Sequence, residues 1–184
     1  MENLFKNYYQ LIQATEECIN NHMIVPSLIL IYSAIDSASW IASDNPNEGV
    51  GSRFKKWVDT WMLNAGEIKC TSEEIYAARC GILHTLTPTS KLSQDKGVRQ
   101  IAYAWGKAKN EELEESISAL SMDDDIVSVH LEDLFLAFRR GFADYLEYVF
   151  NNEVEKAKFL SKSGQHFANI KMEQMNEFLG LSRN

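Results

Sequence analysis

The segment TSEEIYAARCGILHTL, residues 71–86, predicts a capped helix with one apolar stripe. Thr71 is followed three residues later by Glu74, which is the pattern of a capping box, and acidic residues in a first turn suit the positive end of the helix dipole. At about 100° per residue, four apolar side chains fall on one face; they are Ile75, Ala78, Ile82 and Leu86. The segment is therefore expected to start a helix at Ser72 and to pack on the core through this face.

Two polar side chains interrupt this apolar helix. Arg79 lies at the edge of the apolar stripe, and His84 lies roughly 140° farther round. His84 shares its face with small residues that allow a second helix or a backbone segment to approach closely, namely Ala77, Cys80 and Gly81. This geometry indicates that Arg79 and His84 need not touch within one chain. A two-fold partner packed on the small face would bring two arginines and two histidines to one cleft.

An arginine, four residues and a histidine on a helix of a small helical chain resemble the signature of the HEPN superfamily; here the motif runs from Arg79 to His84. Two long helices are expected before the motif, and a Thr-rich turn follows it at Thr85, Thr87 and Pro88. The resemblance covers the helix order of the first half to two thirds of the chain.

The resemblance implies a metal-independent endoribonuclease that acts as a dimer with its two motifs facing each other, as toxins and defence effectors of this superfamily do. His84 would exchange a proton with the ribose 2′-hydroxyl or the leaving 5′-oxygen, and Arg79 would hold the scissile phosphate. The expected product is an RNA end with a 2′,3′-cyclic phosphate. The implied partners are an RNA substrate, a second copy of the chain and an antitoxin protein, and no metal or cofactor is implied.

The alternative is a catalytically inactive HEPN-like module for dimeric interaction or RNA binding. Cys80 supports this alternative, because the residue after the motif arginine is often polar in active members. In such a module Arg79 binds Asp36, and His84 caps the end of its helix. Cys80 could also act as a nucleophile beside His84, but a small buried cysteine explains it more simply.

Asp36 is the one carboxylate in a predicted helix that begins near Pro26 and ends at about Ser43. That helix is apolar almost all round and should be buried on most sides. A buried carboxylate needs a partner, and Arg79 is the candidate if the two helices pack together. Asp36 then either only neutralises and orients Arg79 or is a third member of the site.

Composition predicts one soluble globular domain over residues 1–184, with 45% hydrophobic and 24% charged residues. A net charge of −8 argues against a protein that coats nucleic acid non-specifically. The three cysteines lack CxxC spacing, so neither a disulfide framework nor a zinc site is indicated. The start Met-Glu-Asn lacks a signal peptide, and the longest apolar stretch, near residues 23–31, is too short to span a bilayer. A cytoplasmic location without a membrane is expected.

Residues 91–109 form the only strongly basic stretch, with five Lys or Arg residues against one Asp. Lys91, Lys96 and Arg99 follow His84 closely and are the candidates for holding an RNA backbone. A solvated loop is the alternative for this stretch. Within it, residues 98–105 alternate between large and small side chains, which favours a short strand near 97–106, although helix is not excluded.

The other segments predict an all-α, HEPN-like up-and-down helical bundle. Helices are expected over residues 2–21, 54–62, 128–152 and 153–180 from their apolar spacing. Trp57 and Trp61 are interpreted as core residues and not as platforms for stacking bases. The stretch 111–125 is acidic, and its three consecutive aspartates at 123–125 are interpreted as a solvent-facing turn and not as a metal site.

Overall fold

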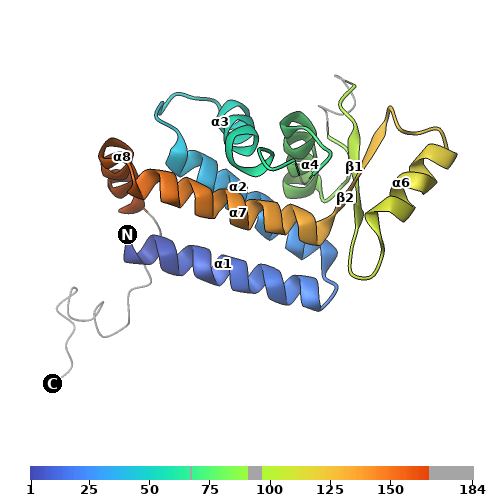
Figure 1. Cartoon of the computed structure of the whole chain (residues 1–184), viewed down its shortest axis with the longest axis horizontal. Coiled ribbons are helices and arrows are strands. Elements are labelled where there is room, and N and C mark those ends of the chain that lie inside the picture. The colour runs from blue at the N-terminus through green and yellow to red at the C-terminus, as the bar shows by residue number, and fades with distance from the viewer. Residues whose placement is uncertain (67, 91–96, 166–184) are drawn as a thin grey trace.

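The computed structural model describes residues 1–66, 68–90 and 97–165 and shows a mostly helical chain with one small sheet (Figure 1). In chain order its elements are α1 (Glu2–Asn20), α2 (Ile24–Ala42), α3 (Val50–Trp57), the π-helix η1 (Val58–Met62), α4 (Ser72–Thr85), β1 (Gln100–Ala104), α6 (Asn110–Ala119), β2 (Ile126–His130), α7 (Leu131–Phe150) and α8 (Glu153–Ser163). The prediction of an all-α fold with a short β segment is confirmed.

The long helix α2 forms the centre of the core. It packs against α1, α3, α4, α7 and α8, and Ile31, Tyr32 and Ile35 on it are fully buried. Figure 1 shows α1, α2 and α7 running along the long axis, with α8 at one end and the sheet with α6 at the other. By length and composition alone, α2 could cross a membrane, although the core helix of a soluble protein passes the same test. Its central packing is compatible with the expected soluble protein.

The predicted strand near 97–106 is β1, and its partner was not predicted. β1 pairs in parallel with β2, with Ile101 opposite Val127 and Tyr103 opposite Val129. Parallel strands need a crossover connection, and α6 provides it. The expected helix over residues 128–152 therefore starts too early, because residues 128–130 complete β2 and α7 begins only at Leu131. The β-branched residues around Ser128 suit a strand once β1 is beside them.

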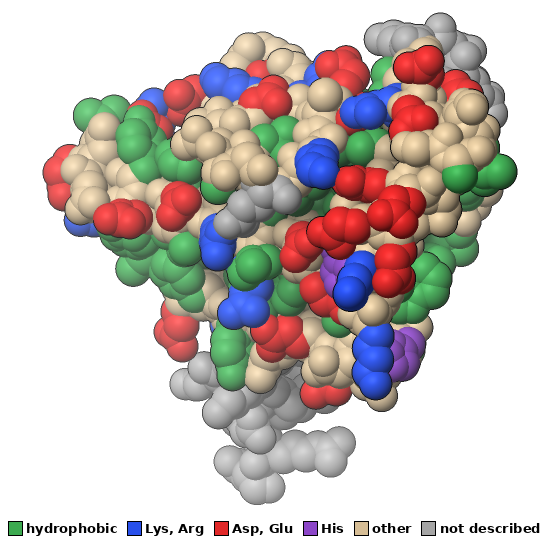
Figure 2. Space-filling view, turned by 45° about the vertical axis from the view of Figure 1, so that its right-hand side comes forward, with side chains coloured by type: hydrophobic (Ala, Val, Ile, Leu, Met, Phe, Trp, Pro, Cys, Tyr) green, Lys and Arg blue, Asp and Glu red, His purple; other side chains and the backbone are tan. Residues whose placement is uncertain are grey.

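The acidic stretch is part helix and part turn. Residues 110–119 form α6, a helix that the acidic composition did not predict, whereas Asp123, Asp124 and Asp125 lie in an exposed turn as expected. Figure 2 turns this side of the molecule toward the viewer and shows acidic side chains gathered on it.

The last predicted helix is shorter in the described residues than the sequence pattern indicated. α8 ends at Ser163, and the rest of the range up to 180 lies almost wholly outside the described residues. The predicted helix over 54–62 is present but begins earlier, at Val50, and its second half is the π-helix η1. Trp57 on it is buried as predicted, whereas Trp61 is only partly buried against the core.

Candidate functional site

Helix α4 is anchored at its start by a capping box. The side chain of Thr71 accepts a hydrogen bond from the Glu74 backbone N–H at 3.2 Å, and Glu74 Oε2 accepts one from the Thr71 backbone N–H at 2.7 Å. Glu74 is buried, and its other carboxylate oxygen accepts from Arg99 Nε at 2.6 Å. The predicted helix start is confirmed, and the ion pair with Arg99 fixes α4 next to β1.

The end of α4 differs from the expected apolar stripe. Ile75, Ala78 and Ile82 are buried as predicted, but Leu86 is 62% exposed and adopts the left-handed conformation with φ 56°. An αL residue just after a helix ends it and turns the chain back. The prediction that Leu86 lies in the core is therefore wrong, because the helix has already ended there.

The small face of α4 is partly covered by the chain itself. A Cβ placed on Gly81 would lie 2.5 Å from the Thr87 carbonyl oxygen and 2.9 Å from that of Thr89. Thr85 Oγ1 donates to the Gly81 carbonyl at 2.9 Å. A hydrogen bond of 2.6 Å also joins the hydroxyl oxygens of Thr85 and Thr87. The close approach that the small residues predicted is thus made by the protein's own backbone, immediately beside His84.

Asp36, Arg79 and His84 form a continuous chain of contacts from α2 to the end of α4. Arg79 donates to Asp36 Oδ2 from Nε at 2.8 Å and also from Nη2. The remaining terminal nitrogen of the guanidinium, Nη1, lies 3.2 Å from His84 Nε2. The pairing of Asp36 with Arg79 that burial predicted is present. The expectation that Arg79 and His84 need not touch is replaced by a direct contact within one protomer.

The environment of Arg79 keeps it charged and holds it in place. Burial of the guanidinium works against its charge, but the hydrogen bonds and the attraction of Asp36 outweigh burial, so the pKa of Arg79 lies above its usual value. The guanidinium also lies over the ring of Tyr76, 5.9 Å from the ring centre. Burial raises the pKa of Tyr76, and the neighbouring Cys80 raises it further. Arg79 is therefore a fixed cation, while the exposed His84 at the outer end of the chain of contacts is open to solvent.

The hydrogen bond between Arg79 and His84 constrains the histidine. A guanidinium has no acceptor, so Nη1 must donate and His84 Nε2 must carry its lone pair. The proton of the neutral ring is then on Nδ1. The described contacts of His84 lead to Arg79 and not to carbonyl oxygens at the helix end, so the capping role considered in the alternative is not what this arrangement shows.

Asp36 is held on one side only. Its Oδ2 receives both bonds from Arg79, whereas Oδ1 is buried and has no hydrogen-bond partner among the described residues. Such an orphaned acceptor is costly unless water or another donor reaches it. The side chains of Arg79 and Asp36 are 13% and 19% exposed, so water can approach the pair.

Of the three predicted RNA-binding residues, the structure describes only Arg99. Lys91 and Lys96 lie outside the described residues. Arg99 forms the ion pair with Glu74 in the first turn of α4, so it contacts the helix roughly 15 Å along its axis from His84. In this structure Arg99 serves the anchoring of α4.

Tyr76 is the site residue that sequence reasoning missed. It lies three residues before Arg79, and this helical spacing is the signal that places its ring beneath the guanidinium.

Compared with family models, with curated proteins and with solved structures, the chain gave no match, so its HEPN membership stays a prediction.

Proposed function

We propose that this chain is a metal-independent endoribonuclease of the HEPN type that cuts RNA as a homodimer and leaves 2′,3′-cyclic phosphate ends. The observation that supports the proposal best is the chain of contacts in which Asp36 holds Arg79 and Arg79 reaches His84 at 3.2 Å. A fixed cation beside an exposed imidazole is what cleavage at a ribose phosphate requires. In line with the superfamily resemblance, we place the protein in the cytoplasm as a toxin or defence effector that an antitoxin protein restrains.

The proposed reaction uses Arg79 and His84 in sequence. A non-bridging oxygen of the scissile phosphate accepts the hydrogen bond from Arg79 Nη1 in place of His84. His84 Nε2 is thereby freed to take the proton from the 2′-hydroxyl, and the 2′-oxygen attacks phosphorus. The bond from phosphorus to the 2′-oxygen forms, and the bond to the 5′-oxygen breaks. Arg79 stabilises the negative charge that develops on the phosphoryl oxygens, and Asp36 keeps the guanidinium oriented.

The departing 5′-oxygen needs a proton, which is the chemical reason for a dimer. One protomer offers one histidine at this site, and after the first step that histidine is protonated and faces the 2′-side. His84 of the partner subunit, in its protonated form, would give its proton to the 5′-oxygen from the other side. The exposed position of His84 is compatible with a second copy completing the site.

An apolar surface next to the end of α4 supports contact with a second copy. Leu86 is 62%, Trp105 45% and Val25 40% exposed. These three side chains line a groove of about 300 Å³ between α2, α4 and β1. Exposed apolar side chains that gather in one place mark interaction sites. Since Leu86 follows His84 by two residues, a copy docked on this groove would bring its own α4 close.

The test is a cleavage assay on structured and unstructured RNA with EDTA present. Wild-type protein is compared with His84→Ala and with Lys6→Ala, a control at an exposed position on α1. We expect the wild type and the control to cut at equal rates and His84→Ala to be slower by about 10²-fold or more. Mass spectrometry of the products should show the cyclic phosphate. Equal cleavage by the wild type and His84→Ala, or none by the wild type, ends the proposal.

The competing function is a binding module without catalysis. One observation favours it: the guanidinium of Arg79 already engages Asp36 with two nitrogens and His84 with the third. In such a module the three residues only tie α2 to α4. The wild type would then leave RNA intact in the assay above, and RNA binding, if present, would be equal in the wild type and His84→Ala.

A further inference from the structure

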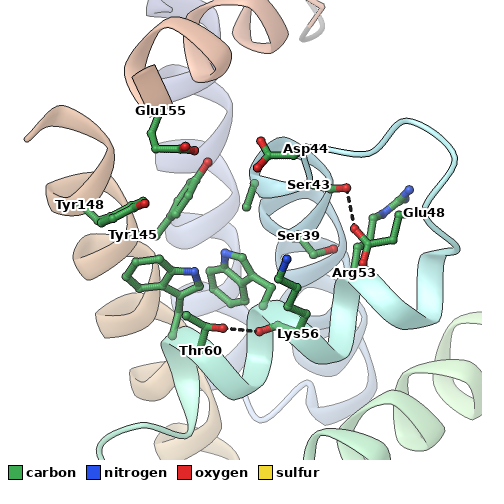
Figure 3. A pocket seen from close by; sticks show the side chains of 13 residues that line it. Ser39, Ser43, Asp44, Glu48, Arg53, Lys56, Thr60, Tyr145, Tyr148 and Glu155 are labelled. Atoms are coloured by element: carbon green, nitrogen blue, oxygen red, sulfur yellow. Dashed lines mark hydrogen bonds between the residues drawn. The ribbon is translucent and has the colours of Figure 1, made fainter. Parts of the chain in front are cut away.

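A pocket lies away from the Arg79 site, where α2 ends and α3, η1 and α7 meet (Figure 3). Its volume is about 360 Å³, at the lower end of the range of small-molecule sites. One wall consists of aromatic rings and the other of polar and charged side chains. Its lining includes Arg53, Lys56, Trp57, Trp61, Tyr145 and Tyr148.

Two buried donors at this pocket have no acceptor within residues 1–66, 68–90 and 97–165. Trp57 is only 2% exposed, and its Nε1 has no hydrogen-bond partner among the described residues. The same holds for Nε of Arg53, one turn earlier on α3. Trp57 and Arg53 both line the pocket. A buried N–H without a partner costs about 1–3 kcal/mol, so such groups call for an acceptor that the described part of the chain does not supply.

The acidic side chains around the pocket have partners of their own, and the basic ones are less well paired. Asp44 and Glu155 both bind Lys158, at 3.0 Å and 2.8 Å, and Glu48 accepts hydrogen bonds from the hydroxyls of Ser43 and Ser52. These hydrogen bonds, followed by the positive charges of Lys56 and Arg53, hold the pKa of Glu48 below its usual value. By contrast, Arg53 and Lys56 make no ion pair with the described residues.

Part of the aromatic wall is carried by a π-helical turn. Trp61 and Thr60 belong to the π-helix η1, and short π-helical turns occur frequently at functional sites. Gly141 of α7 lies directly against this turn, where a Cβ would be 2.6 Å from the Trp61 carbonyl oxygen. The ring of Trp61 packs 5.5 Å from that of Tyr145 and 5.4 Å from that of Tyr148. The close packing of α7 against η1 thus fixes the ring of Trp61 in the wall.

We propose that this pocket binds a small aromatic anion, a flat ring that carries a carboxylate or phosphate group. The acidic group accepts hydrogen bonds from Trp57 Nε1 and Arg53 Nε and is neutralised by Arg53 and Lys56. The ring packs against Trp61 and Tyr148. Lys56 and Tyr148 come from α3 and α7, and Figure 3 shows both on the rim of the same cavity. The proposal is independent of ribonuclease activity, because neither Arg79 nor His84 lines this pocket.

Isothermal titration calorimetry of the full-length protein with matched probes tests the proposal. The probes are 2-naphthoate, 2-naphthyl phosphate, 2-naphthol and inorganic phosphate. We expect one of the two aromatic anions to bind with a one-to-one stoichiometry, and 2-naphthol and inorganic phosphate to bind at least about tenfold more weakly. The better of the two anions identifies the acidic group that the pocket recognises.

Variants locate the binding site. Arg53→Met should raise the dissociation constant at least about tenfold, whereas Lys107→Met, at an exposed lysine outside the pocket, should leave it unchanged. Lys56→Met, at an exposed position, and Trp61→Leu give the same information if Arg53→Met fails to fold. The proposal is overturned if neither anion binds, if 2-naphthol binds as tightly as the anions, or if binding survives in the folded pocket variants.

Discussion

Nη1 of Arg79 lies 3.2 Å from Nε2 of His84, five residues farther along the same helix. The angular offset of roughly 140° between the two Cβ directions suggested separation. The contact exists because the arginine side chain is long and Asp36 turns its guanidinium along the helix surface. A single protomer therefore already pairs the cation with the imidazole, and a partner is needed only for the second proton transfer.

Arg79→Lys should slow cleavage strongly although it keeps the positive charge. A lysine ammonium is a single point charge and cannot bind Asp36 and reach the position of Nη1 at the same time. We expect a loss of about 10²-fold or more in cleavage rate and a modest fall in the free energy of unfolding, measured by urea titration. Nearly full activity in Arg79→Lys would show that charge alone is enough and that the fork geometry has no role.

Asp36→Asn should separate a positioning role from a purely structural one. The amide keeps the size of the side chain but removes the charge that favours the guanidinium, so the free energy of unfolding should fall by about 1–3 kcal/mol. If Asp36 orients Arg79 for RNA, cleavage at saturating RNA should also fall at a temperature where the variant is fully folded. An unchanged cleavage rate in the folded variant would mean that Asp36 only ties α2 to α4.

The features that the sequence predicted best are those set by local spacing. The capping box of Thr71 and Glu74 defined the start of α4, and the apolar stripe predicted its buried face. β2 was missed because a strand of five residues is distinguished from the first turn of a helix only by its partner, and β1 lies 26 residues away in register. The ion pair of Asp36 and Arg79 was predictable, since a carboxylate in an apolar helix must find a cation.

The remaining features depend on side-chain reach and on packing between distant elements. Helical angles describe Cβ directions and ignore the length of arginine, so they did not predict its contact with His84. The pocket was missed because Trp57 and Trp61 were both interpreted as core, whereas only Trp57 is fully buried. The signal was Arg53 four residues before Trp57, a spacing that puts a cation on the same helical face as a tryptophan.

Gly81→Ala should destabilise the turn beside His84. The added Cβ would lie 2.5 Å from the Thr87 carbonyl oxygen, and backbone cannot move away as easily as a flexible side chain. We expect a loss of about 1–3 kcal/mol in the free energy of unfolding together with slower cleavage. Gly164→Ala is the control, because its Cβ meets only ordinary contact at 3.9 Å; it should be neutral or stabilising by up to about 1 kcal/mol. Equal effects of the two substitutions would contradict the close packing at Gly81.

Gly141→Ala should damage the proposed anion pocket, although Gly141 itself does not line it. The new methyl group would push against the Trp61 backbone and shift the ring of Trp61 in the wall. We expect the dissociation constant of the better naphthyl anion to rise severalfold, measured by calorimetry. Ala143→Gly, at an exposed position on the same helix, is the control for stability, since it should cost about 1 kcal/mol and leave binding intact. Weaker binding in both variants would point to a general loosening of α7.

Alkaline pH should destabilise the fold through its buried tyrosines. The hydroxyls of Tyr32 and Tyr103 share a hydrogen bond, and burial raises the pKa of both well above the usual value for tyrosine. In the unfolded chain these groups lose their protons at about pH 10. Below that pH both states hold the proton, and stability does not depend on it. Above it the unfolded state binds fewer protons, so the free energy of unfolding falls as pH rises.

Each tyrosine that ionises only on unfolding contributes a slope of about −1.4 kcal/mol per pH unit. Urea titrations of the wild type at pH values from about 9 to about 11 should show this fall begin near the ordinary tyrosine pKa. Tyr32→Phe removes one such group and should make the slope shallower by about 1.4 kcal/mol per pH unit. Tyr9→Phe, at a side chain that is 61% exposed, is the control for the loss of a tyrosine hydroxyl. A slope that is the same in the wild type and Tyr32→Phe would mean that the Tyr32 hydroxyl ionises as readily in the folded protein as in the unfolded chain.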